Sequence, residues 1–170
     1  MPFEYIIQAI GLIGFFTGVS AFLCKSDKAL KLLIGLASCI VALHFLFLEA
    51  YVGAGAASLT ALRSFLSIFK TVKPYAPFFF AAYIPLGYFY IGDWVDCLPI
   101  IGGLIGTYAM FYLERLPMRY GLFVTSSFWL THNVLQGSIG ASLLEFFYLA
   151  ANTRTILQLR KEDQDSTSQQ

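Results

Sequence analysis

The chain has 170 residues, of which 58% are hydrophobic and only 12% are charged, and its mean hydropathy is +0.69. This composition excludes an ordinary water-soluble domain and indicates an integral membrane protein. The formal net charge of +1 hides an uneven distribution of charge along the chain.

Seven apolar segments follow one another along the chain, each close to the roughly 20 residues that a helix needs to cross a bilayer. They cover residues 5–23, 29–48, 51–69, 74–91, 95–113, 117–135 and 139–157. We therefore predict an all-α polytopic membrane protein with seven transmembrane helices. The first segment has no basic residue ahead of it and is longer than the apolar core of a secretory signal, so we expect it to be retained. Residues 160–170 are polar and are expected to form a disordered cytoplasmic tail.

The basic residues predict the orientation of these helices. All eleven fall on one side of the membrane if the seven segments are helices, nearly all of them in alternate loops. They are Lys25, Lys28, Lys31, Arg63, Lys70, Lys73, Arg115, Arg119, Arg154, Arg160 and Lys161. Basic loops face the cytoplasm, so we expect a periplasmic N-terminus and a cytoplasmic C-terminus. Because these residues lie in short loops beside the bilayer, where they meet anionic headgroups, soluble nucleic-acid binding is excluded.

A shift of 88 residues aligns the chain with itself and brings its two histidines into register. The aligned pairs are Gly14 with Gly102, Gly18 with Gly106, Ser38 with Ser126, His44 with His132 and Ile68 with Ile156. We predict two parallel three-helix repeats, residues 1–73 and 94–159, joined by a linker transmembrane helix at residues 74–93. Sugar facilitators of the SWEET type have this arrangement. The paired glycines, one turn apart, would let neighbouring helices approach closely.

An ionisable side chain inside the bilayer costs several kcal/mol unless it faces a cavity or a partner, and Glu145 and Arg63 are the two clearest candidates for such a position. Glu145 lies about 10 Å from the outer end of the seventh helix, and Arg63 lies about 18 Å into the third. Under the shift they fall on Ala57 and Ala151, so the two repeats differ at their charges. We hypothesise that both face one central cavity and are linked directly, through water or through a solute. The alternative is a structural ion pair, or an arginine that extends to the cytoplasmic headgroups.

Other polar side chains accompany both charges at helical spacing. One stripe contains Glu145, Tyr148, Asn152 and Thr155, and the other contains Thr60, Arg63, Ser64 and Ser67. Two matching stripes are what a solute path needs. Hydroxyl and amide groups can equally bond their own helix or its neighbour.

Both histidines lie about one turn inside the predicted outer interface. Each could titrate, line an outer vestibule, or hydrogen-bond a neighbouring helix to hold the bundle. Asn133 adjoins His132, and Trp129 lies one turn before it on the same face, where an aromatic ring could stack on a planar solute. The predicted substrate-binding residues are Glu145, Arg63, Asn152, Tyr148, His132, Asn133, His44 and Trp129. The histidines have no evident further ligands and the three cysteines have no C-x-x-C spacing, so we predict no metal, disulfide or cofactor.

Two blocks of the sequence resemble the YgjV-type family of bacterial inner-membrane proteins. They are His44-Phe45 followed by Gly53-Ala54 and Arg63, and His132-Asn133 followed by Gly137-Ser138-Ile139-Gly140 and Glu145. The resemblance covers residues 5–159 and implies a multi-pass protein of the inner (cytoplasmic) membrane, in a family whose function is not established. The three-one-three organisation is also similar to that of SWEET and PnuC transporters of sugars and vitamins. The Pro-Gln pair of the PQ-loop relatives is absent, however, and Glu145 and Arg63 replace mostly neutral solute sites.

These observations predict a small-solute membrane transporter or facilitator in which two three-helix bundles rock around a central site. Its partners would be the lipid bilayer and an unknown small polar solute. The alternative is a non-transporting structural or accessory inner-membrane protein whose polar residues hold the bundle together. No serine-histidine or paired-aspartate arrangement lies at matching depth, so we predict no enzymatic activity. One chain can close the bundle, yet its small-residue faces could still form a homo-oligomer.

Overall fold

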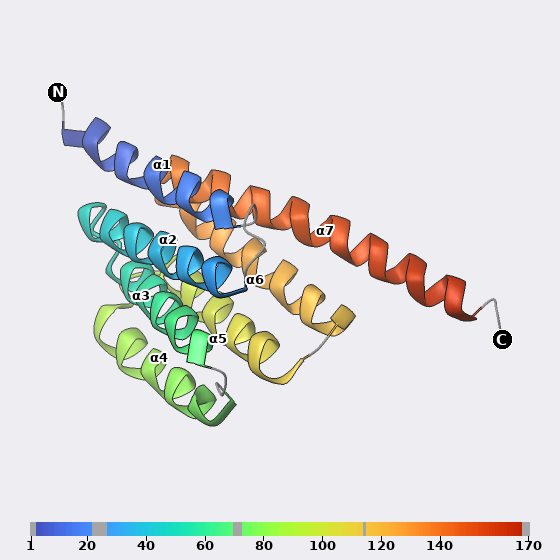
Figure 1. Ribbon diagram of the computed structural model, residues 1–170. Helices are drawn as coiled ribbons and strands as arrows, with labels where there is room; N and C mark the ends of the chain where they lie inside the picture. Colours follow the sequence, from blue (N-terminus) through green and yellow to red (C-terminus); the bar gives the residue numbers. More distant parts are fainter. Residues whose placement is uncertain (1–2, 22–26, 70–72, 114, 168–170) are drawn as a thin grey trace.

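The computed structural model of the chain describes residues 3–21, 27–69, 73–113 and 115–167. Within these residues every regular element is helical, and seven α-helices run alternately in opposite directions (Figure 1). The α-helices are α1 (Phe3–Ala21), α2 (Asp27–Phe47), α3 (Tyr51–Leu66), α4 (Ala76–Tyr90), α5 (Cys97–Tyr112), α6 (Arg115–Leu135) and α7 (Ile139–Thr167). Two short 3-10 helices, η1 (Ser67–Phe69) and η2 (Lys73–Tyr75), lie between α3 and α4. The prediction of an all-α fold is confirmed.

Each predicted segment corresponds to one helix, with boundaries that differ by a few residues except at the end of α7, which continues ten residues beyond residue 157. α3, α4 and α5 have only 15 or 16 residues, so each spans about 22–24 Å along its axis. By length and hydropathy alone, α1 is the one described helix that qualifies as a membrane span, while the stretches Lys31–Phe47 and Cys97–Tyr112 are apolar but shorter.

The C-terminal end of α7 differs from the expectation of a disordered tail from residue 160. The helix continues to Thr167 without interruption, and residues 168–170 lie outside the described part of the chain. Extension of a helix that has already formed fixes one residue for each new hydrogen bond, and Gln, Leu, Arg, Lys and Glu are good helix formers. An exposed ion pair of 3.3 Å between Arg115 of α6 and Asp163 of α7 also joins the two helices there.

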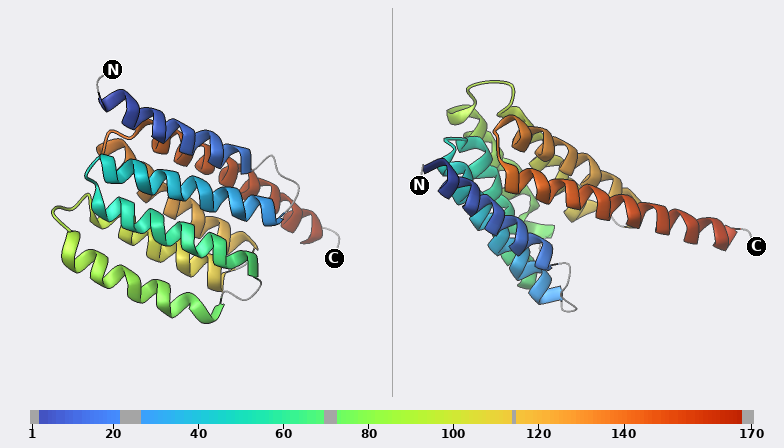
Figure 2. Two further views of the ribbon diagram at one scale, coloured as in Figure 1. Left: turned by 60° about the vertical axis from the view of Figure 1, so that its left-hand side comes forward. Right: turned by 90° about the horizontal axis from the view of Figure 1, so that it is seen from above.

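The helices form two layers. In the left view of Figure 2, α1, α2, α3 and α4 lie side by side in chain order, and α7, α6 and α5 lie behind them. Contacts link α1 with α2 and α7, and they link α3 with α2, α4 and α5. In the right view, α1 and α2 diverge from α7 toward the C-terminal end of that helix. The first helix of each triplet, α1 or α5, therefore contacts the last helix of the other, α7 or α3.

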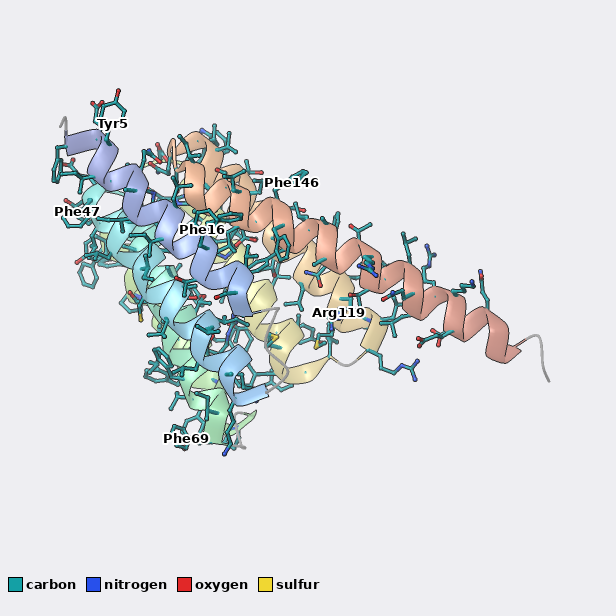
Figure 3. The ribbon with its side chains drawn as sticks, turned by 45° about the horizontal axis from the view of Figure 1, so that its top comes forward. Tyr5, Phe16, Phe47, Phe69, Arg119 and Phe146 are labelled. Carbon is teal, nitrogen blue, oxygen red and sulfur yellow. The ribbon has the colours of Figure 1, made fainter. Side chains whose placement is uncertain are left out.

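Small side chains fill much of the interior, and large apolar side chains cover the outside. Gly14, Gly18, Gly102 and Gly106 are all buried. All seven α-helices expose large apolar side chains, including the labelled Phe16 and Phe146, each 66% exposed (Figure 3). Large apolar surfaces of this extent mark contact with a membrane or another protein.

Candidate functional site

The two histidines lie in the interior of the bundle and bond equivalent atoms of their neighbouring helices. Each is completely buried. The Nδ1 atom of His44 lies 2.9 Å from the carbonyl oxygen of Ile7 on α1, and that of His132 lies 3.3 Å from the carbonyl oxygen of Val95, just before α5. The two carbonyls are 88 residues apart, as are the two histidines. These contacts match the interpretation of a histidine that joins one helix to the next.

The partners of the histidines determine which nitrogen carries the proton in the neutral rings. A backbone carbonyl only accepts hydrogen bonds, so Nδ1 is the donor in both residues and Nε2 is an acceptor. Nε2 of His44 lies 2.7 Å from the hydroxyl of Ser138, which donates to it. Nε2 of His132 has no hydrogen-bond partner among the described residues, and neither has Oδ1 of the buried Asn133. The second histidine site is thus incomplete in hydrogen bonding.

The turn before α3 and the turn before α7 share most of their backbone hydrogen bonds. Four bonds in the first turn recur 88 residues later, with donor-acceptor distances of 2.9–3.2 Å in both turns. Glu49 and Gly137 occupy the same position of the two turns and have φ angles of 59° and 67°. In this alignment Ala50 takes the place of Ser138. The serine hydroxyl that donates a hydrogen bond to His44 therefore has no counterpart near His132.

Arg63 is partly buried and bonds residues of the neighbouring helices. Its guanidinium donates a 3.1 Å hydrogen bond to the hydroxyl of Thr107 on α5. The Tyr83 hydroxyl of α4 bonds the same threonine and lies close enough to Arg63 for an electrostatic interaction. A guanidinium in this position joins α3, α4 and α5 through polar groups rather than through a carboxylate.

Glu145 is also partly buried, on the face of α7 that contacts α6 and α1. It forms a hydrogen bond with the hydroxyl of Ser126 on α6, and Tyr148 lies within electrostatic range of its carboxyl group. A Cβ atom added to Gly18 of α1 would lie 3.2 Å from the Tyr148 hydroxyl, so the absence of a side chain there leaves room for the tyrosine. The carboxyl group therefore lies at the contact between α6 and α7, and the neighbouring Tyr148 reaches α1.

The remaining predicted site residues are distributed along the interior. Asn152 accepts a 3.4 Å hydrogen bond from Arg119 of α6. The ring of Trp129 lies 5.9 Å from that of His132 at 89°. Several hydroxyl groups of the two predicted stripes bond carbonyls four residues earlier in their own helices: those of Thr60, Ser64 and Thr155.

The structure brings some of the predicted site residues together and keeps others apart. Trp129 and His132 are in contact, and Glu145 lies near Tyr148. Arg63 and Glu145 have different partners on different helices, and no ion pair joins them in the described part of the chain. The direct link between them is therefore absent, whereas a link through water or a solute stays a prediction.

Sequence reasoning did not select four polar residues that complete these contacts. Thr107 accepts a hydrogen bond from Arg63, and Tyr83 lies within electrostatic range of it. Ser126 bonds Glu145, and Ser138 bonds His44. A serine just before an apolar helix is the usual N-cap signal and could have directed attention to Ser138. The other three lie on different helices from their partners, and no sequence spacing connects them.

Comparison with known proteins agrees with the resemblance in the sequence. Residues 5–163 match the Imp-YgjV family, which is described as bacterial inner membrane protein. The chain is 26% identical over 158 residues to the inner membrane protein YgjV of Escherichia coli (strain K12), a match that covers 93% of this chain and 86% of that protein. No solved structure matches the chain. The chain therefore belongs to the Imp-YgjV family of bacterial inner membrane proteins.

Proposed function

We propose that all seven α-helices cross the inner membrane, with the N-terminus in the periplasm and the C-terminus in the cytoplasm. The large apolar side chains exposed on every α-helix support this, because a water-soluble bundle would bury most of them. Successive helices run in opposite directions, so the helix ends that carry basic residues all lie on one side of the molecule (Figure 1). The short helices α3, α4 and α5 would require local thinning of the bilayer or polar residues that extend to its surface.

The proposal includes two three-helix repeats, α1–α3 and α5–α7, joined by α4. Its support comes from the recurrence of hydrogen bonds at an interval of 88 residues. The histidine contacts with Ile7 and Val95 recur, and so do four bonds of the turns before α3 and α7. In unrelated helical hairpins, a positive φ angle and a histidine contact would not both be expected to recur at the same interval of 88 residues.

Within this framework the chain would act as a small-solute transporter or facilitator, in which the two bundles rock around a central site. The observation that carries this proposal is the position of Arg63 in the last turn of α3 and of Glu145 in the second turn of α7, both partly buried among polar groups of neighbouring helices. Ionisable residues at membrane depth are costly and commonly mark solute or ion pathways. α3 and α7 occupy equivalent places in the two repeats, so movement of one bundle against the other would change the surroundings of both charges.

The direct test is uptake into vesicles that contain the purified protein, with sugars, vitamins, nucleosides and amino acids as trial solutes. Glu145→Gln is expected to abolish the flux of a transported solute or shift its pH optimum, because Glu145 would bind the solute or a proton. Glu4→Gln makes the same chemical change at an exposed position and is expected to leave flux unchanged. Equal flux in both variants would remove Glu145 from the mechanism.

Thermal stability separates this proposal from a purely structural role of the polar residues. Under the structural alternative, Glu145→Gln and Arg63→Ala lower the melting temperature in detergent and no solute protects the parent protein. Under the transport proposal, a solute raises the melting temperature of the parent but not that of Glu145→Gln. The size of that increase reports the concentration of solute relative to its dissociation constant.

A further inference from the structure

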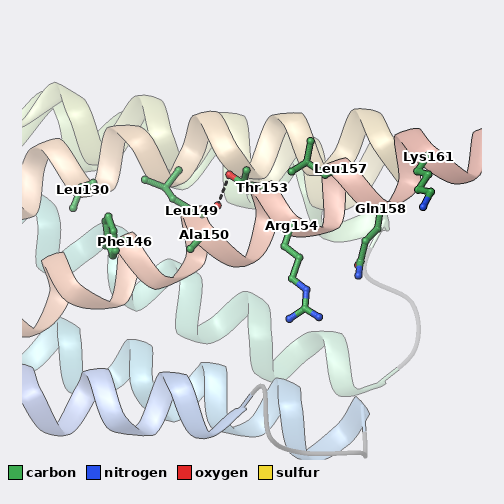
Figure 4. A pocket seen from close by; sticks show the side chains of 9 residues that line it. All are labelled: Leu130, Phe146, Leu149, Ala150, Thr153, Arg154, Leu157, Gln158 and Lys161. Carbon is green, nitrogen blue, oxygen red and sulfur yellow. Dashed lines mark hydrogen bonds between the residues drawn. The ribbon is translucent and has the colours of Figure 1, made fainter. Parts of the chain in front are cut away.

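The outer surface of α6 and α7 contains a groove of about 820 Å³ whose lining changes from apolar to basic along its length. Its walls are Leu130 of α6 and, on α7, Phe146, Leu149, Ala150, Thr153, Arg154, Leu157, Gln158 and Lys161. Figure 4 shows these side chains in sequence along α7, with Phe146 at one end and Lys161 at the other. The groove is shallow and open along its length, so it suits a ligand that lies along the surface of the protein.

This groove is separate from the interior polar contacts. Its α7 side chains are mostly exposed, whereas the face of the same helix that carries Glu145, Tyr148 and Asn152 is partly buried against other helices. Phe146 is 66% exposed and Leu157 is 61% exposed. In the proposed membrane orientation these outward side chains meet lipid rather than the path of a solute.

The basic end of the groove contains two cations, Arg154 and Lys161. In the described part of the chain neither Arg154 nor Lys161 forms an ion pair. Arg154 is about 22 Å and Lys161 about 33 Å along α7 from its first residue, Ile139. The hydrocarbon core of a bilayer is about 30 Å thick. If α7 crosses the membrane from the periplasm, Lys161 therefore lies just beyond the cytoplasmic boundary of the core, and Arg154 lies about 8 Å inside it, from where its long side chain can extend to the headgroups.

We propose that this groove binds an anionic glycerophospholipid of the cytoplasmic leaflet. An acyl chain lies along Phe146, Leu149 and Ala150, and the phosphate lies between Arg154 and Lys161, with Gln158 as a hydrogen-bond donor. Arginine and phosphate form strong charge-assisted hydrogen bonds, and neither cation has an ion-pair partner among the described residues. The apolar part requires a hydrocarbon chain, which a free phosphate does not have.

The test measures binding of phosphatidylglycerol to the purified protein by native mass spectrometry, with phosphatidylcholine of the same acyl chains and inorganic phosphate as comparisons. Phosphatidylglycerol is expected to bind more tightly than either. At roughly fivefold for each lost cation, the double variant Arg154→Gln with Lys161→Gln binds it about 25-fold more weakly. Arg160→Gln removes the same charge from an exposed residue outside the groove and is expected to change little.

A second variant tests the apolar part without a change of charge. Ala150→Trp places an indole ring in the groove at an exposed position, so it is expected to weaken phosphatidylglycerol binding while the fold persists. The proposal is overturned if the two phospholipids bind equally, or if Arg160→Gln weakens binding as much as the double variant does. Equal affinity for inorganic phosphate would also overturn it, because the site would then recognise an anion and not a lipid.

Discussion

Replacement of Ala50 by serine should complete the hydrogen bonding of His132. Ala50 stands directly before α3, as Ser138 stands directly before α7, and it is only 4% exposed. A Cβ atom added to Gly53 would lie 2.6 Å from Nε2 of His132, so this nitrogen lies against the first turn of α3. A hydroxyl at residue 50 would occupy the position from which Ser138 donates to His44 over 2.7 Å.

Two contributions to the free energy of unfolding are expected from Ala50→Ser. Hydrogen bonds between membrane helices contribute about 0.6 kcal/mol on average and up to about 1.7 kcal/mol. A serine in place of alanine at an N-cap contributes about 1 kcal/mol more. The total of roughly 2 kcal/mol corresponds to a rise of about 4–8 °C in melting temperature for a chain of this size.

A double-mutant cycle separates the two contributions. Thermal unfolding in detergent is measured for the parent, Ala50→Ser, His132→Phe and the double variant. If the hydroxyl bonds Nε2, the serine stabilises the His132→Phe background only through its N-cap effect, and the coupling energy is about 0.6–1.7 kcal/mol. The same gain in both backgrounds would refute the hydrogen bond, and with it the argument that the turns before α3 and α7 are equivalent in their side-chain geometry.

Three further substitutions test the same turns and the contact between α1 and α7, all by thermal unfolding in detergent. Ser138→Ala should lower stability by about 2 kcal/mol, because His44 loses its donor and α7 loses its N-cap; no change would mean that another group satisfies the histidine. Glu49→Gly should raise stability by about 1 kcal/mol, since a positive φ angle is strained for glutamate, and a loss would contradict this. Gly140→Ala should lower stability by about 3 kcal/mol, because its Cβ atom would collide with the backbone of Gly11; tolerance would show that α1 and α7 can separate.

Helix positions were predictable from the sequence because they depend on local properties. Apolar length fixed the number of helices, and the α3 and α7 starts at Tyr51 and Ile139 coincide with the predicted ones. The C-terminal part of α7 was not predictable in this way, since composition alone does not distinguish a disordered tail from the extension of an existing helix. Its polar residues continue the helix because their helix propensities favour it once α7 has formed.

The side-chain contacts of the candidate site could be predicted only in part. The matching positions of His44 and His132 followed from the 88-residue shift, but their partners did not, because each partner lies on another helix. The charge on Arg63 suggested an acidic partner, yet the structure gives it hydroxyl groups. An interior guanidinium needs hydrogen-bond acceptors, and the nearest acceptors depend on how the helices pack rather than on residue spacing.

The two halves of the chain are most alike where they hold the helices together and least alike where they carry charge. The turns before α3 and α7 share four backbone hydrogen bonds, and the two histidines contact carbonyl groups 88 residues apart, those of Ile7 in α1 and of Val95 just before α5. The equivalents of Arg63 and Glu145 are alanines, so neither charge is needed to form this common scaffold. A buried charge that the scaffold does not require still costs free energy. Each charge therefore belongs to one half alone, where Arg63 bonds Thr107 of α5 and Glu145 bonds Ser126 of α6, and the flux and melting-temperature measurements on Glu145→Gln and Arg63→Ala decide between solute binding and a structural role.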